Sequence, residues 1–177
     1  MFMAPGKNKK YSGGRPVSKA ALKVFLDRAA ALAEPILAGM GLELVMARSP
    51  LLGGRPVIRL FIDRPGPGAV SLNDCASVSR ALEAALEAED ASAPDGYVLE
   101  ISSPGLDRPL LKPEDCLRFQ GRRARLKIRR GGTSGVYRGR LTSSETGGLA
   151  LETEAGRLDF EWSEVVSGRL ALDEPMV

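Results

Sequence analysis

The sequence predicts an α+β protein of two domains, an α-β-β-α-β domain of two layers followed by a small antiparallel β-barrel. Helix-like and strand-like apolar patterns alternate in the first part of the chain, and short strands between Gly-rich turns fill the last third. A length of 177 residues also suits two small domains. We expect a disordered basic arm at 1–17, the α+β domain at 18–103, a hinge with a short helix at 104–120 and the barrel at 121–177.

The arm at 1–17 contains four cations, no acids and no apolar period. This composition is typical of a disordered segment. Such an arm can bind phosphates or simply keep the chain in solution, and the sequence leaves both interpretations open.

The first helix is predicted to begin after the capping residue Ser18 and to end at Gly41, which favours a left-handed helix stop. Pro35 lacks the amide that would bond to the carbonyl of Ala31, so we expect a kink or a restart near Glu34. The apolar positions with helical spacing are Leu22, Phe25, Leu26, Ala29, Leu32, Ile36 and Met40.

A β-hairpin is predicted next, with its turn at Leu51 to Gly54. The faces expected to be buried carry Leu42, Leu44 and Met46 in the first strand and Ile58, Leu60 and Ile62 in the second. The second strand also carries Val57 and Phe61 on its other face, which favours a central position in the sheet.

The second helix is predicted from Ser71, which forms a capping-box pattern with Asp74, to about Asp90. A strand over 97–102 completes the first domain. The buried stripe of the helix is expected to be Leu72, Cys75, Val78, Leu82 and Leu86.

A different architecture begins at Gly121, after a short helix predicted at Lys112 to Phe119. Short strands are predicted at 122–129, 136–143, 149–154, 157–162 and 168–172. This spacing is typical of a five-stranded antiparallel barrel.

The segment from Tyr97 to Leu110 contains the string Leu-Glu-Ile-Ser-Ser-Pro-Gly-Leu-Asp-Arg-Pro-Leu, which resembles the signature of the bacterial ribosome maturation factor RimP family. The order of elements over about 18–172 is also similar to that family. The resemblance implies a KH-like first domain and an SH3-like or Sm-like barrel, in which Gly139 would occupy a bend of a strand. The chain lacks the Gly-x-x-Gly loop between helices that RNA-binding KH modules carry.

Basic residues are concentrated between 122 and 140, where eight cations and no acids occur. Strand alternation places six of them on one outward surface as candidate rRNA contacts, namely Arg123, Arg125, Lys127, Arg129, Arg138 and Arg140. The alternative is neutralisation within the barrel by the outward acids Glu152, Glu154, Asp159 and Glu161.

The hinge offers Ser102, Ser103, Asp107 and Arg108 as candidate contacts to a partner. The alternative is that this loop only holds the domains together. Either serine would need a general base to act as a nucleophile, and the chain contains no histidine.

The acids Glu83 and Glu87 of the second helix are candidates for docking a basic ribosomal protein, although most such runs are solvated helix faces. Cys75 and Cys116 have no partner ligands at metal-site spacing, so we expect free thiols and no metal. We expect no membrane span and a place in the cytoplasm.

The function implied by the resemblance is a non-enzymatic assembly factor for the small (30S) ribosomal subunit. The expected partners are the immature subunit, its 16S rRNA and a basic small-subunit protein, and we expect a monomer without a cofactor. Two alternatives stay open. One is a stand-alone Sm-like RNA-binding regulator, which a ring-sized solution mass would favour, and the more distant one is a serine hydrolase.

Overall fold

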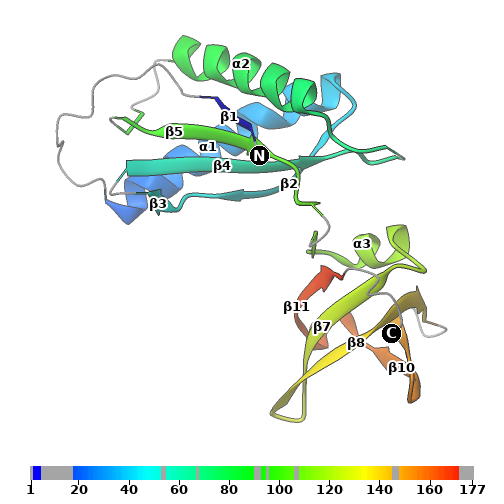
Figure 1. The fold of residues 1–177 in the computed structure, drawn as a ribbon. Coiled ribbons are helices and arrows are strands. Elements are labelled where there is room, and N and C mark those ends of the chain that lie inside the picture. The colour runs from blue at the N-terminus through cyan, green and yellow to red at the C-terminus, as the bar shows by residue number, and fades with distance from the viewer. Residues whose placement is uncertain are drawn as a thin grey trace. The chain divides into compact units, whose positions relative to one another are not determined.

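The computed structural model describes residues 2–4, 18–52, 55–66, 68–89, 93–94, 96–105, 108–144 and 148–171. The chain divides into two compact units, unit 1 at Met1–Pro104 and unit 2 at Gly105–Val177 (Figure 1). Each unit has its own sheet and its own apolar core. Among the helices of the described residues, none combines the length and apolar character of a membrane span.

The sheet of unit 1 has the strand order β1-β5-β4-β2, with β3 paired to β4. Its strands are β1 (Phe2–Ala4), β2 (Glu43–Arg48), β3 (Leu51–Leu52), β4 (Arg55–Asp63) and β5 (Val98–Ser102). Strand β4 runs antiparallel to β2 and parallel to β5, and Figure 1 shows it between them. The predicted central position of this strand is therefore confirmed.

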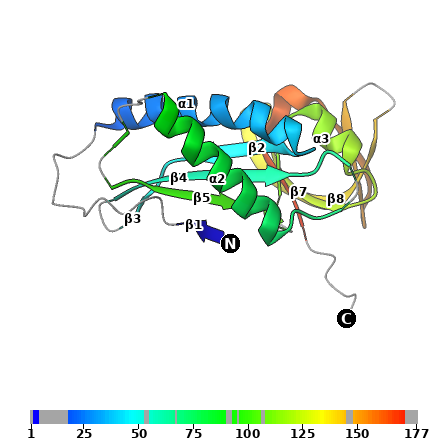
Figure 2. The same ribbon diagram turned by 90° about the horizontal axis from the view of Figure 1, so that it is seen from above.

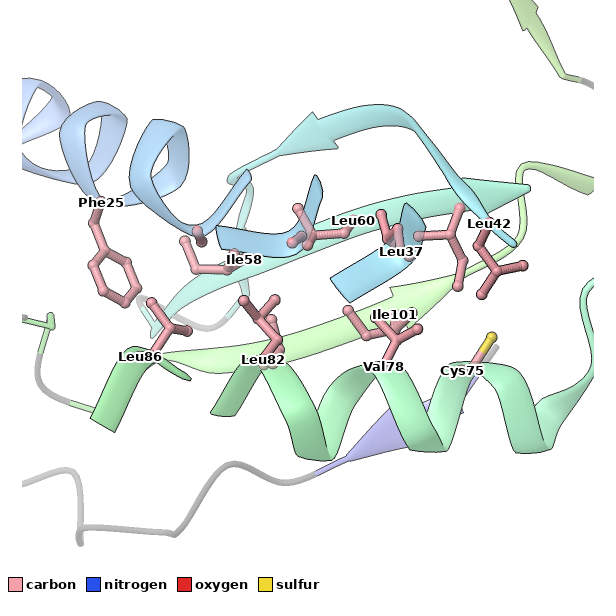
Figure 3. Packing of buried hydrophobic residues seen from close by; sticks show 14 of the residues in the cluster. Phe25, Leu37, Leu42, Ile58, Leu60, Cys75, Val78, Leu82, Leu86 and Ile101 are labelled. Carbon is pink, nitrogen blue, oxygen red and sulfur yellow. The ribbon is translucent and has the colours of Figure 1, made fainter. Parts of the chain in front are cut away.

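Helices α1 (Lys19–Gly39) and α2 (Leu72–Ala88) pack against this sheet, and Figure 2 shows α2 lying obliquely to α1 and to the strands. Figure 3 shows Val78 and Leu82 of α2 pointing into the same interior as Ile58 and Ile101 of the sheet. All four side chains have no exposed surface. Burying apolar side chains of this size contributes roughly 1.5 to 3 kcal/mol each, so this layer is the main source of stability in unit 1.

Both helices begin at the predicted caps. The Ser18 hydroxyl accepts a hydrogen bond from the Ala21 amide. Ser71 and Asp74 form a complete capping box, and the hydrogen bond from the Ser71 amide lowers the pKa of the Asp74 carboxyl. The predicted stripe of α2 is correct except at its first position, because Leu72 is 64% exposed.

Helix α1 runs through Pro35 as one helix, so of the predicted kink or restart near Glu34 the restart is wrong, and the kink stays a prediction. Pro35 is exposed and removes only its own amide, while Ala33 and Leu37 on the buried side keep their core contacts. The buried stripe therefore ends at Leu37, whereas the predicted Met40 is 38% exposed.

A bulge lies between Leu44 and Met46 of β2, where the pairing with β4 shifts its register. Because of this extra residue, Leu44 and Ala47 pack against the core of unit 1. The prediction that Met46 shares a face with Leu44 is wrong, since strict alternation holds only for an unbroken ladder.

Strand β1 pairs antiparallel with β5, with Phe2 opposite Ile101. Residues 2–4 thus differ from the disordered arm predicted for 1–17, because they add to an edge of β5 that would otherwise leave amides and carbonyls unpaired. The other residues of the predicted arm lie outside the described residues.

Unit 2 is an antiparallel sheet with strand order β10-β9-β8-β7-β11-β6. Its elements are β6 (Pro109–Leu110), α3 (Pro113–Arg118), β7 (Arg123–Arg130), β8 (Thr133–Ser143), β9 (Leu149–Thr153), β10 (Gly156–Phe160), the 3-10 helix η2 (Trp162–Glu164) and β11 (Val165–Leu170). The short helix and all five strands predicted after the hinge are present, and β6 is an addition to them.

The antiparallel strands of the predicted barrel are present, but over the described residues of unit 2 they do not form a closed barrel. Closing a sheet requires its two terminal strands to pair. Those strands are β10 and β6, and no described pair joins them. The SH3-like or Sm-like barrel that the resemblance implies is therefore not confirmed, because two-residue β6 pairs only with β11 and the sheet stays open.

Gly139 lies where β8 passes from its pairing with β7 to its pairing with β9. A Cβ atom at this position would lie 2.4 Å from the carbonyl oxygen of Glu152. The backbones of β8 and β9 therefore approach each other closely only because residue 139 is glycine.

Candidate nucleic-acid interface

Strand β7 separates apolar and basic side chains cleanly between its two faces. Ala124, Leu126 and Ile128 are buried in the core of unit 2. The intervening side chains Arg123, Arg125, Lys127 and Arg129 point to the other face, where all but the half-buried Arg123 are exposed. Alternate residues of a strand lie about 6.6 Å apart, so these four cations form a line along the outer face.

Neighbouring strands extend this line into a surface. Arg125 is directly opposite Arg138 of β8 and directly opposite Arg169 of β11. Three arginines therefore form a row across three neighbouring strands, and adjacent strands lie about 4.8 Å apart. Like charges in direct opposition destabilise a sheet by tenths of a kcal/mol. We call the outward side chains Arg123, Arg125, Lys127, Arg129, Arg138, Arg140 and Arg169 the basic face.

Arg169 was missed by the sequence reasoning. Its strand, β11, is the fifth after the hinge, yet it pairs with β7 rather than with β10. The only signal in the sequence was the alternation of Arg169 with Gly168 and Leu170, which gives no information about the neighbouring strand.

Neutralisation by the acids of unit 2 is restricted to one side of the basic face. Glu152 lies opposite Arg140, but it also lies opposite Arg157 of β10. Asp159 is held by Arg157, whose hydrogen bonds lower the pKa of the Asp159 carboxyl.

Glu164 is paired with Arg130, which lies outside the basic face. Two hydrogen bonds from this guanidinium lower the pKa of the Glu164 carboxyl to about 2. In the described part of the chain, Arg125, Lys127, Arg129 and Arg138 form no ion pair. Full neutralisation of the basic face by the acids of unit 2, which was the alternative interpretation of the sequence, therefore does not apply to these four cations.

The basic face presents charge without an aromatic platform. Tyr137 of β8 turns away from it and packs at a tilt against Phe160, with ring centroids 5.0 Å apart. The outward neighbours of Lys127 on the adjacent strands are Val136 and Ser167. Such a surface suits phosphate oxygens better than stacked bases.

The hinge residues do not gather into one site. Ser102 is half-buried and donates a hydrogen bond to the Ser103 carbonyl, while Ser103 is exposed. Asp107 lies outside the described residues. Within the described residues, neither serine therefore contacts a basic group that could remove its proton.

Arg108 is buried in unit 2, with 4% of its surface exposed. Its guanidinium lies 3.6 Å from a carboxylate oxygen of Asp115 and stacks 5.0 Å from the ring centre of Phe119. The same Asp115 carboxylate accepts hydrogen bonds from the amides of Leu111 and Lys112 at the start of α3. Arg108 thus holds the β6–α3 connection instead of being presented to solvent.

The acidic candidates Glu83 and Glu87 lie one turn apart on α2, the first half-buried and the second exposed. Burial raises the pKa of the nearby Tyr97 hydroxyl, and the negative charges of both glutamates raise it further. We call Glu83 and Glu87 the acidic surface of unit 1, in which Glu87 is exposed and one carboxylate oxygen of Glu83 is buried.

The two cysteines are buried in different cores. Burial raises the pKa of both thiols, that of Cys116 to about 11, so the reactive thiolate is disfavoured. Over the described residues, the side chains of His, Cys, Asp and Glu form no group of three or more suited to a metal ion.

The fold and the basic face together define a two-unit α+β protein with a β-sheet surface suited to polyanions. Residues 32–107, which extend from α1 through the serines of the hinge, match the family model of the RimP N-terminal domain. This match supports the resemblance of the chain to the RimP family, which is associated with ribosome maturation. The family is generally non-enzymatic, and its partners are associated with the ribosome.

Proposed function

We propose that this protein is a non-enzymatic assembly factor that binds the immature small (30S) ribosomal subunit in the cytoplasm. Its basic face holds the backbone of 16S rRNA. The proposal rests on the row of Arg169, Arg125 and Arg138 across three strands. Arg125 and Arg138 have no ion pair among the described residues.

Phosphate binding explains why such a row exists. Each phosphate that a cation neutralises releases counterions, so the binding free energy compensates for repulsion within the free sheet. Contacts of this kind position a protein on folded RNA without reading its sequence. The basic face therefore supplies affinity for rRNA, and a further contact gives specificity for the small subunit.

We assign that further contact to the acidic surface of unit 1. Glu83 and Glu87 suit a cationic small-subunit protein, because opposite charges accelerate its encounter with α2. The factor then acts as a monomer that engages rRNA through unit 2 and a basic protein through unit 1.

The test of the basic face is binding to a structured 16S rRNA fragment and to immature small subunits between about 50 and about 300 mM KCl. Replacing Arg125 and Arg138 together by serine should lower the slope of log affinity against log salt by roughly 0.7 to 0.9 for each lost phosphate contact. The matched control replaces Arg130 and Arg157, which are already paired with Glu164 and Asp159, and removes the same charge. Equal slopes for both double variants would overturn the proposed role of the basic face.

A further inference from the structure

Unit 2 contains a pocket that the basic face does not include. Its volume is about 360 Å³, which lies at the small end of the range for ligand sites. The lining comes from α3, the end of β8, the start of β9 and the segment around η2. The residues that form it are Pro113, Cys116, Leu117, Thr142, Gly148, Leu149, Glu161, Trp162 and Ser163.

The walls of the pocket combine apolar and polar groups and are partly uncovered. Leu117 is 59% exposed although it lines the pocket. Trp162 is half-buried, and in the described part of the chain its indole N–H has no hydrogen-bond acceptor. A large apolar side chain and an indole left open at one pocket are suited to an inserted apolar group.

Glu161 is the only charged residue of the lining. The neighbouring acids Asp159 and Glu164 are each paired with an arginine. Glu161 instead accepts a hydrogen bond from the Ser163 hydroxyl and has no ion pair within the described residues. The pocket therefore presents one negative charge next to an aromatic ring, and this charge forms no ion pair within the described residues, although it interacts electrostatically with Arg130.

We propose that this pocket binds an extended segment of a cationic protein, with an apolar side chain between Leu117 and Trp162 and an adjacent Lys or Arg against Glu161. The ring of Trp162 adds a cation–π contact to the same cation. An RNA backbone is disfavoured because Glu161 repels phosphate, and residues 172–177 of this chain are disfavoured because they carry Asp173 and Glu174. The inference rests on the proposed function only for the expectation that the cationic protein belongs to the small subunit.

Trp162 makes the test specific, because it is the only tryptophan of the chain. The probes are capped peptides added to the full-length protein, Gly-Lys-Leu-Lys-Gly together with Gly-Lys-Ala-Lys-Gly and Gly-Glu-Leu-Glu-Gly. The first peptide should shift and saturate the Trp162 fluorescence. The alanine peptide should bind about tenfold more weakly, since most of the apolar burial is lost, and the glutamate peptide should leave the emission unchanged.

Two variants with matched controls locate the binding. Leu117→Ser should lower the affinity for the leucine peptide about tenfold, and Glu161→Gln should lower this affinity roughly threefold at low salt. The controls are Leu111→Ser, an equally exposed leucine outside the lining, and Glu154→Gln, at the opposite end of the β9–β10 hairpin. Both controls should bind as the parent does.

Three results would overturn the proposal. They are equal binding of the glutamate and lysine peptides, an unchanged affinity of Leu117→Ser, and a fluorescence change produced by an RNA duplex instead of by the peptide. These measurements contain no ribosomal particle, so their failure leaves the salt dependence of rRNA binding untouched. Conversely, if the basic face does not bind rRNA, the peptide titration can still be interpreted.

Discussion

The two units differ in how their arginines are paired with acids. In unit 1, Arg28 is paired with Glu89, Arg59 with Glu100 and Arg64 with Asp74. In unit 2, four cations of the basic face have no such partner among the described residues. Paired charges of unit 1 serve its fold, whereas the unpaired charges of unit 2 are available to a ligand.

The location of the pairs supports this distinction. Arg59 and Glu100 stand directly opposite each other on the parallel strands β4 and β5, where Glu100 is 1% exposed. Arg64 joins the end of β4 to the capping box of α2 through Asp74. A charge that completes a strand pair or a helix cap cannot be removed without a cost in stability, while Arg125 or Arg138 can.

The largest expected effect is therefore on the buried pair of unit 1. Arg59→Met leaves the Glu100 carboxylate buried without its counter-ion, which should lower the free energy of unfolding by about 3 kcal/mol. Urea unfolding followed by circular dichroism measures the change. Arg28→Met, which breaks an exposed pair, should cost less than about 1 kcal/mol. A similar loss in both variants would contradict the structural role of the buried pair.

Arg108 tests whether a paired arginine of unit 2 follows the rule of unit 1. Arg108→Met removes the partner of buried Asp115 and should destabilise unit 2 by about 2 to 3 kcal/mol, with Trp162 fluorescence as the reporter of that unit. Affinity for rRNA should stay unchanged wherever the variant is folded. Unchanged stability with lost binding to the immature subunit would instead favour a direct partner contact.

The close approach of β8 and β9 gives the third prediction. Gly139→Ala places a Cβ atom against the Glu152 carbonyl, so β9 must move, and we expect a loss of about 1 to 3 kcal/mol in unit 2. Gly135→Ala is the comparison, because its Cβ would meet only the movable ring of Tyr137 at 3.0 Å. Equal unfolding midpoints would show that the backbone of β9 yields easily, and the basic face would then be less rigid than the pairing of β7 with β8 indicates.

Local chemistry made much of the fold predictable, and long-range pairing limited the rest. The capping box of Ser71 and Asp74 and the alternation along β7 depend on neighbours in the chain, and both were found from sequence. The bulge of β2 and the opposition of Arg169 to Arg125 depend on pairing between distant segments. The burial of Arg108 likewise depends on α3, so the hinge string alone could not separate a structural arginine from an exposed one.

The smallest effect concerns pH and separates the paired acids from the unpaired ones. The pKa of Glu164 is about 2 in the folded protein, below its ordinary value of 4.5, because Arg130 donates hydrogen bonds to it. A carboxyl with a lowered pKa stabilises the folded state above its unfolded pKa, and that contribution is lost as the pH falls from about 4.5 towards about 2. Glu164→Gln should therefore be less stable than the parent at pH 7, and the difference should shrink over this window.

Urea unfolding of unit 2, followed by Trp162 fluorescence at several pH values, measures this difference. Glu154→Gln is the control, since Glu154 has no ion pair in the described residues. A gap between Glu164→Gln and the parent that stays constant down to pH of about 2.5 would mean that Arg130 does not hold this carboxylate in solution. Arg130 would then be a further unpaired cation of unit 2, on the opposite face of β7 from the basic face.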